Sequence, residues 1–201
     1  MSQVSQVSTA STGSTHERIV AAAAQLTSES GWAAITMTKL ADRVGVSRQT
    51  VYNEIGSKPQ LAEEMVLREL ALFLAEVERA FDAHPDDLVA AIRGACRGVL
   101  ELAQDNRLLK AVVSATHGAD TELLPLLTTH SESLLETAKA VVRERVAAYP
   151  EAGSGALPPG RLDAAIDLIV RVVLSHVMQP SGSPQDTADD IAWLSSQALA
   201  P

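Results

Sequence analysis

The chain has 201 residues, of which 46% are hydrophobic, 20% charged and only 3% aromatic, and its net charge is −9. This composition excludes a wholly disordered protein and predicts one compact domain, or two small ones, with an aliphatic core. The single Cys96 excludes an internal disulfide framework, no apolar run reaches the ~18 residues of a membrane span, and the N-terminus lacks a signal-peptide pattern, so we expect a cytoplasmic protein.

The first half of the chain carries closely spaced helix signals after a polar start. Residues 1–14 are mostly Ser, Thr, Gln and Val without periodicity, so we expect a disordered tail. Apolar residues at helical spacing predict helices at 15–30, 37–44 and 48–54, and a long one that starts at 58 and stops before Pro85. Ser and Thr cap helix starts and Gly permits the positive φ that ends a helix, and such residues flank these segments: Ser14 or Thr15, Gly31, Thr36, Gly45, Ser47 and Ser57.

The second half of the chain is also helical in pattern. Periodic apolar residues predict further helices at about 87–103, 106–116, 124–148, 161–178 and 185–199. The Pro- and Gly-rich stretch at 150–160 predicts a flexible loop. Because no segment alternates in the manner of a strand, we predict an all-α protein with about nine helices.

The distribution of charge leaves nucleic-acid binding open for the N-terminal part. Residues 1–58 carry a net charge of +1, whereas the remainder carries −10. Within this part, two short predicted helices are joined by Gly45-Val46-Ser47, and the second has a polar outward side. This arrangement is typical of a helix-turn-helix, whose second helix reads the major groove of DNA.

The run from Thr36 to Lys58 also resembles the tetracycline-repressor (TetR/AcrR) family of bacterial transcription regulators. The matching residues are Gly31, Thr36, Leu40-Ala41, Gly45-Val46-Ser47, Thr50-Val51-Tyr52 and Ser57-Lys58-x-x-Leu61. Glu54 and Ile55 depart from the family pattern, which usually has an aromatic or His at the first position and an aromatic at the second. The resemblance implies a ligand-responsive regulator, here a repressor, with a tail at 1–14, a helix-turn-helix domain at 15–60 and an effector-binding and dimerisation domain at 61–201.

The outward residues of the second short helix are the expected DNA contacts. Arg48 and Gln49 lie at its N-terminal end, where Arg can donate two hydrogen bonds to guanine and Gln can pair with adenine. Hydroxyl groups and Lys58 suit phosphates, and Lys58 also lies at a helix N-terminus that attracts anions. The predicted contacts to double-stranded operator DNA are Thr36, Thr38, Arg48, Gln49, Thr50, Tyr52, Asn53 and Lys58. Arg43 fits a phosphate contact or a solvated charge equally well, and Tyr52 fits a core position as an alternative.

The last two predicted helices carry apolar stripes that fit a homodimer interface. The helix at 161–178 has a wider stripe than one packing partner requires, and the helix at 185–199 extends it. A palindromic operator also needs two recognition helices about 34 Å apart, which a dimer supplies. The alternative is that these stripes pack only on their own subunit. The predicted interface residues are Ile166, Ile169, Val170, Val173, Val177, Ile191 and Leu194.

The central helices are expected to enclose an effector pocket. Candidate wall residues, each of which also fits an ordinary core position, are Phe73, Val77, Leu100, Leu108, Val112, Leu127 and Leu134. Few aromatic residues are available to stack on planar cations, so an aliphatic pocket indicates a small hydrophobic effector resembling a fatty acid.

The sequence offers no support for an enzyme. Its five histidines show no metal-ligand spacing, and no glycine-rich phosphate loop follows a predicted strand. We therefore expect no catalytic residues, no metal site and no cofactor. The alternative function is a helical small-molecule carrier or scaffold that no longer binds DNA, which Glu54 and the overall acidity favour.

Overall fold

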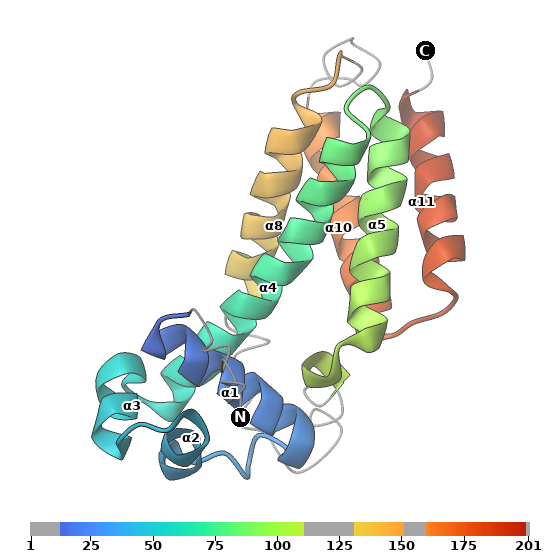
Figure 1. Ribbon diagram of the computed structural model, residues 1–201. Coiled ribbons are helices and arrows are strands. Elements are labelled where there is room, and N and C mark those ends of the chain that lie inside the picture. Colours follow the sequence, from blue (N-terminus) through green and yellow to red (C-terminus); the bar gives the residue numbers. More distant parts are fainter. Residues whose placement is uncertain (1–12, 111–130, 151–159, 200–201) are drawn as a thin grey trace, which may run out of the picture. The chain divides into compact units, whose positions relative to one another are not determined.

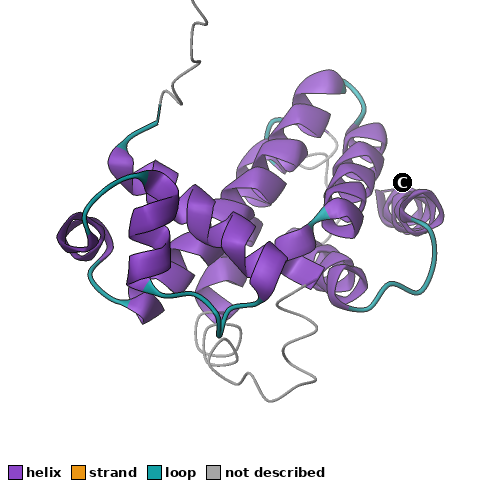
Figure 2. Cartoon of the chain, turned by 60° about the horizontal axis from the view of Figure 1, so that its bottom comes forward, coloured by secondary structure: helices purple, strands orange, loops and turns teal. Residues whose placement is uncertain are grey.

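The computed structural model describes residues 13–110, 131–150 and 160–199, and every regular element in these ranges is a helix (Figure 2). The predicted all-α fold is confirmed. The helices are α1 Thr15–Ser30, α2 Met37–Val44, α3 Arg48–Ile55, α4 Lys58–Ala83, α5 Leu88–Asp105, α8 Ser131–Val146, α10 Arg161–Met178 and α11 Pro184–Leu199.

The helix bounds agree with the sequence prediction to within about two residues wherever both ends are described. Residues 107–110 are helical as predicted, but the rest of the predicted helix at 106–116 lies outside the described residues. The tail at 1–12, the predicted start at 124 and the loop at 151–159 lie outside them as well. The chain forms two compact units, Met1–Met65 and Val66–Pro201, and α4 contributes to both.

The first unit has a core built from three helices and the start of α4. The side chains of Ile19, Leu40, Val51 and Leu61 have no exposed surface. They come from α1, α2, α3 and α4 in that order, so each helix contributes one apolar stripe to a common core. This core leaves the opposite side of α3 facing solvent.

Side-chain caps define where these helices begin. Ser14 and Glu17 form a reciprocal capping box at the start of α1. The Thr36 hydroxyl accepts a hydrogen bond from the Lys39 amide at 3.2 Å, and the Ser47 hydroxyl accepts one from the Thr50 amide at 3.0 Å. Gly45 ends α2 in the left-handed conformation with φ 77°. These local interactions therefore fix the turn between α2 and α3.

The second unit is a helical bundle in which α8, α4, α10, α5 and α11 lie side by side (Figure 1). Its larger core cluster includes Phe81, Leu88 and Tyr149. The Tyr149 ring packs edge-on against Phe81 with centroids 5.9 Å apart, and its hydroxyl donates to the His84 carbonyl at 2.7 Å. A smaller cluster joins Cys96 of α5 to Ala188 and Ile191 of α11. The aromatic ring is thus anchored where α4 ends, and α11 is anchored along α5.

Candidate nucleic-acid interface and apolar cavity

Helix α3 separates an inward from an outward side sharply. Val51 is 0% and Ile55 6% exposed, so Ile55 fills the inward position at which the sequence departs from the TetR pattern. Among the outward residues, Tyr52 is 38% exposed, which places it at the surface and not in the core. Arg48, Gln49 and Asn53 are exposed as predicted, and Thr50 is half-buried.

The outward side chains of α3 are paired across one helical turn. A guanidinium nitrogen of Arg48 donates to the Tyr52 hydroxyl at 3.2 Å, and the guanidinium carbon lies 5.4 Å from the centroid of the Tyr52 ring. The Gln49 amide donates to the Asn53 side-chain oxygen at 2.9 Å. Residues four apart lie one above the other on a helix, so this spacing was readable in the sequence, although the pairs were not predicted. Pairing limits the rotamers that these side chains adopt.

The predicted phosphate contacts lie on neighbouring elements of the same unit. Thr36 and Thr38 are exposed at the start of α2, and Lys58 is half-buried at the start of α4. The Lys58 ammonium lies 4.8 Å from the centroid of the Trp32 ring, while Trp32 itself is only 3% exposed. This cation–π contact joins residues that are distant in sequence, so no local pattern predicts it.

Other cations of this unit are bound to protein groups. Arg43 pairs with Glu29 at 2.8 Å, and this hydrogen-bonded pair lowers the pKa of Glu29 and raises that of Arg43. The Lys39 ammonium donates to the Ala34 carbonyl at 2.8 Å, and Arg18 donates to the Val44 carbonyl at 2.6 Å. Arg43 was left open between a phosphate contact and a solvated charge, and its exposed ion pair with Glu29 favours the second of these.

The end of α3 is tied to α1. The His16 Nδ1 lies 3.2 Å from the Glu54 main-chain carbonyl, and His16 Nε2 lies 3.4 Å from a carboxylate oxygen of Glu64. Glu54 itself is exposed. The main chain at Glu54, which like Ile55 departs from the TetR pattern, therefore helps to position α3 in its unit.

The second unit contains an apolar cavity of about 380 Å³. Side chains of α4, α5, α8, α10 and α11 line it, and Ser195 and Cys96 are the polar types among them. Ser195 already donates its hydroxyl to the Ile191 carbonyl at 2.8 Å. The cavity thus offers hydrocarbon surface and almost no hydrogen-bonding capacity.

The predicted pocket residues are only partly brought together. Phe73 and Val77 line the apolar cavity, whereas Leu100 lines a separate pocket. Leu108 and Leu134 line neither of these two pockets. Val112 and Leu127 lie outside the described residues.

The predicted dimer residues also line the apolar cavity, all seven of them. Ile166 is only 3% and Ile191 only 5% exposed, so these two belong to the core of their own subunit, and their assignment to the interface is corrected. Ile169, Val170, Val173 and Val177 are partly buried, and only Leu194 is strongly exposed. The apolar stripe in the sequence therefore marks the side of each helix that packs against its own subunit, because the apolar side of an amphipathic helix faces the core.

The exposed apolar side chains of α10 and α11 form a partly different set, which we call the apolar face, and four of them, Leu168, Val172, Leu174 and Leu194, also line the apolar cavity. Most of its members were not predicted as interface residues, because sequence spacing does not show which apolar side chains of a helix remain exposed after folding. They are Leu168 at 63% exposure, Val172 at 42%, Leu174 at 45%, Met178 at 41%, Trp193 at 61% and Leu194 at 59%.

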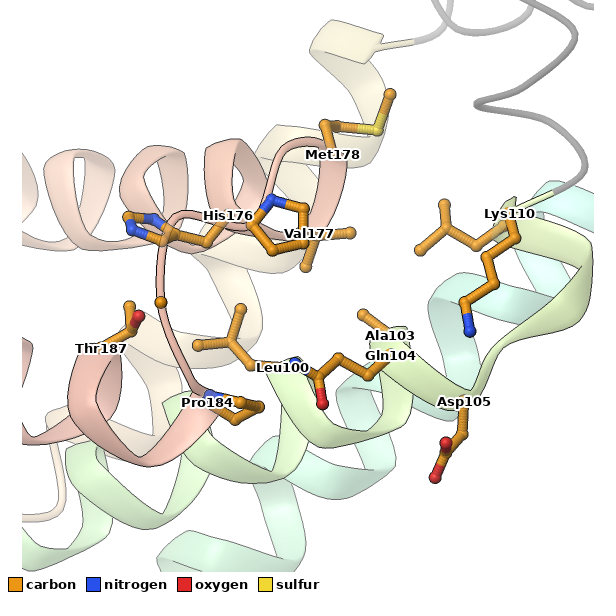
Figure 3. Close-up of a pocket in the computed structure, with 13 residues that line it drawn as sticks. Leu100, Ala103, Gln104, Asp105, Lys110, His176, Val177, Met178, Pro184 and Thr187 are labelled. Carbon is orange, nitrogen blue, oxygen red and sulfur yellow. The ribbon is translucent and has the colours of Figure 1, made fainter.

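A second pocket of about 490 Å³ lies between the end of α5, the end of α10 and the start of α11 (Figure 3). Val177 lines both this pocket and the apolar cavity. In contrast to the cavity, its lining includes the polar or charged side chains of Gln104, Asp105, Lys110 and Thr187. His176 also lines it, with Nδ1 2.9 Å from the Val172 carbonyl and Nε2 3.0 Å from the Ser181 hydroxyl. A pocket whose lining is mainly apolar but includes several polar side chains thus adjoins the apolar cavity.

Within the described ranges, no cluster of three His, Cys, Asp or Glu side chains has the geometry to hold a metal ion. Among the helices that the structure describes, none has the length and hydropathy of a membrane span.

Comparison with protein families decides the identity of the chain. The model of bacterial regulatory proteins of the tetR family matches residues 19–65, which contain α2 and α3. The model of the bacterial tetracyclin repressor C-terminal domain matches residues 87–197, more than half of the chain. The chain belongs to the TetR family. It is a ligand-responsive DNA-binding transcriptional regulator, as predicted.

Individual TetR proteins resemble the chain over most of its length. The HTH-type transcriptional regulator AlkX of Mycobacterium tuberculosis is 30% identical over 163 residues, which cover 81% of this chain and 74% of the relative. The structure of the TetR family repressor AlkX from Dietzia sp. strain DQ12-45-1b has a TM-score of 0.70 and 26% identity, covering 92% of this chain and 95% of that one. A tetR family regulator from Rhodococcus RHA1 shares the fold with a TM-score of 0.55 at 18% identity, covering 94% and 98%.

Proposed function

We propose that this protein is a homodimeric repressor that leaves a palindromic operator when a small hydrophobic effector binds. The observation that carries this proposal is the outward side of α3, which is polar and solvent-facing while Val51 and Ile55 bury the opposite side. The apolar cavity in the second unit supplies the place for the effector.

The proposed DNA contacts divide into two classes. Arg48, Gln49, Thr50 and Asn53 would face base edges, because α3 is the second helix of the helix-turn-helix. Thr36, Thr38, Tyr52 and Lys58 would bind phosphates, which set the register of the protein without specifying sequence. Each bidentate base contact would contribute about 1–3 kcal/mol of discrimination.

The proposed dimer forms through the apolar face of α10 and α11. Six large apolar side chains there are at least 41% exposed, which is unfavourable in water for an isolated chain. A second copy of the chain covers such a surface in both subunits at once, since a two-fold interface is self-complementary. The same symmetry would place two recognition helices on two half-sites.

The proposed effector is an amphiphile with a hydrocarbon chain, such as a fatty acid or an acyl ester. Each methylene buried in the apolar cavity contributes about 0.8 kcal/mol, so a medium chain binds tightly without polar contacts. The polar end needs partners that the cavity lacks, and the adjoining pocket offers Gln104, Lys110 and Thr187 (Figure 3). The Asp105 carboxylate lines the same pocket and would repel an anionic head group, so an uncharged ester fits there better than a free carboxylate. The Dietzia AlkX, which is implicated in biodegradation of n-alkanes, supports this ligand class.

Release from DNA requires that the effector bind the DNA-incompetent state more tightly. A differential affinity worth about 1–3 kcal/mol is typical of such coupling. Helix α4 begins at Lys58, a proposed DNA contact, and contributes Phe73 and Val77 to the cavity. One helix therefore carries residues for both DNA binding and effector binding.

The proposal is tested by fluorescence anisotropy with labelled DNA from the flanks of the protein's own gene, at about 50 and about 200 mM salt. We expect saturable binding that weakens steeply with salt and is reversed by a fatty acid but not by a planar cationic drug. Val142→Phe, which fills the cavity, should reduce the response to fatty acid, whereas Leu72→Phe at an exposed position outside the cavity should not.

Two results would contradict the proposal in different ways. Thermal stabilisation by fatty acids without binding to any DNA would favour the carrier function. Release of DNA by the cationic drug alone would remove the lipid-like effector and retain the regulator.

A further inference from the structure

Asn106 forms the corner between two helices at the edge of the second pocket. Its main-chain amide donates to the Ala103 carbonyl at 3.3 Å and so ends α5, while its own carbonyl accepts a hydrogen bond from the Lys110 amide at 3.1 Å. The side-chain oxygen of Asn106 accepts another from the Leu109 amide at 2.8 Å, which makes Asn106 the N-cap of the helical residues 107–110. One residue thus ends one helix and begins the next.

The same side chain joins this corner to α4. Its amide nitrogen donates to a carboxylate oxygen of Glu69 at 2.5 Å, across 37 positions of sequence. The orientation of the amide is determined, because the Leu109 N–H needs an acceptor and the Glu69 carboxylate needs a donor. Asn106 and Glu69 are both half-buried, and both belong to the unit Val66–Pro201. Only a side chain that carries an acceptor and a donor satisfies both partners at once.

The other side of the corner belongs to the second pocket. Residues before and after Asn106 line this pocket, although Asn106 itself does not; they are Gln104, Asp105, Leu109 and Lys110 (Figure 3). The polar end of an effector bound there would contact the chain directly on both sides of the corner. The corner therefore has one side toward the pocket and one toward α4.

Helix α4 gives this contact its significance. Glu69 lies in the helix between Lys58, a proposed DNA contact, and Phe73, which lines the apolar cavity. Contiguous contacts between packed elements carry coupling between distant sites. A bond that joins the wall of the pocket to this helix can therefore transmit the presence of an effector to the residues that bind DNA.

We propose that the hydrogen bond between Asn106 and Glu69 couples effector binding to release of the operator, with Asn106 as a positioning residue that contacts neither ligand. This inference rests on the proposed function, because it requires an effector that releases the protein from DNA. When the effector displaces the corner, the bond makes α4 follow. Without the bond, each ligand still binds, but neither changes the affinity for the other.

Two substitutions in the full-length protein break the bond and rebuild it. Asn106→Asp keeps the cap, because Asp accepts from the Leu109 amide as well as Asn does, but it removes the donor and sets a second carboxylate against Glu69. Glu69→Gln keeps an oxygen that accepts from Asn106. The double variant exchanges donor and acceptor and has the net charge of the wild type. We therefore expect Asn106→Asp to lose the coupling, Glu69→Gln to retain it and the double variant to recover it.

The coupling is measured as the ratio of operator affinities without and with methyl decanoate, an uncharged medium-chain ester, by fluorescence anisotropy. In the wild type the ester should weaken operator binding by about 5- to 150-fold, and in Asn106→Asp this factor should fall to about 1. Calorimetry should show that the ester binds the DNA-free variant as it binds the wild type.

Gln185→Glu is the matched control. It makes the same change from amide to acid beside a carboxylate, since the Gln185 amide donates to Asp189 at 2.7 Å within α11. Because the added charge is the same, both acidic variants should bind the operator alike when no ester is present. With the ester, Gln185→Glu should be released as the wild type is.

Three results would overturn the proposal while the regulator stands. They are full release of Asn106→Asp by the ester, a double variant that does not recover the response, and loss of ester binding in Asn106→Asp, which would show that Asn106 only shapes the pocket. If the ester does not release the wild type from the operator, the effector part of the proposed function fails and this inference fails with it.

Discussion

Cys96 shows how the apolar interior changes the chemistry of a single group. Its side chain is 5% exposed, contacts Ala188 and Ile191, and lines the apolar cavity. Burial away from water penalises the thiolate and raises the pKa of Cys96 from its ordinary 9.0 to about 12. The thiol is therefore neutral across the physiological range and is inert as a nucleophile.

We predict that native Cys96 resists alkylation. Raising the pKa from 9.0 to about 12 lowers the thiolate fraction about a thousandfold at pH 8, and burial slows access further. Iodoacetamide modification followed by mass spectrometry should therefore be at least this much slower in buffer than in urea. Because the folded pKa is the higher one, the stability that the neutral thiol contributes is complete below pH 9 and is lost as the pH rises toward 12. Equal rates in the two solutions would show that the thiol is accessible.

Single residues also show what a sequence pattern leaves undetermined. Arg43 was assigned to neither of its two roles because its partner Glu29 is 14 positions away and on another helix. Lys58 was identified as a cation beside the motif, yet its contact with Trp32 depends on the tertiary fold. Local spacing determines which side of a helix a residue occupies, but not which distant group it meets.

The bounds of the two helix-turn-helix helices were predicted closely because they are set by capping residues directly beside each helix. Thr36 and Ser47 cap the two helices through their own hydroxyls, and Gly45 adopts the one conformation for which glycine is needed there. The start of α11 was placed one residue late, since Pro184 occupies the first turn and not the preceding loop. Proline is suited to that position because the amide it lacks would have no helical partner.

At the scale of the element, we predict that the turn between α2 and α3 depends on Gly45. Its φ is 77°, and a Cβ added there would meet nothing within 4 Å, so a substitution incurs conformational strain alone. Gly45→Ala should lower the free energy of unfolding by about 1–2 kcal/mol in urea titrations followed by circular dichroism. Gly45→Asn is the matched control and should cost less, because Asn tolerates the left-handed conformation better. Equal effects of the two substitutions would point to a cause other than backbone strain.

At the scale of the whole molecule, the division between core and surface on α10 and α11 changes the expected interface. The apolar stripe in the sequence led to Val173 and Val177, but both pack against the core of their own subunit. Asp at either position would therefore damage the subunit before it tested a dimer. Exposure in the folded chain, which no periodicity reports directly, points to the apolar face.

Trp193 provides the sharpest test of the dimer, because it is 61% exposed and lines neither of the two pockets. Wild type should sediment at about twice the chain mass of 21.2 kDa, and Trp193→Glu should shift this toward the single chain. The matched control is Leu72→Glu, a 43% exposed position on α4 outside the apolar face, which should remain dimeric.

Tryptophan fluorescence provides an independent measure of the same association. Trp32, the other tryptophan, is already buried at 3% exposure, so a blue shift with rising protein concentration would report Trp193 leaving water. Loss of the dimer should also reduce affinity for a two-half-site operator far more than for a single half-site, since the second contact is no longer intramolecular. A wild-type chain that sediments as a monomer at every concentration would contradict both the interface and the two-half-site mode of binding.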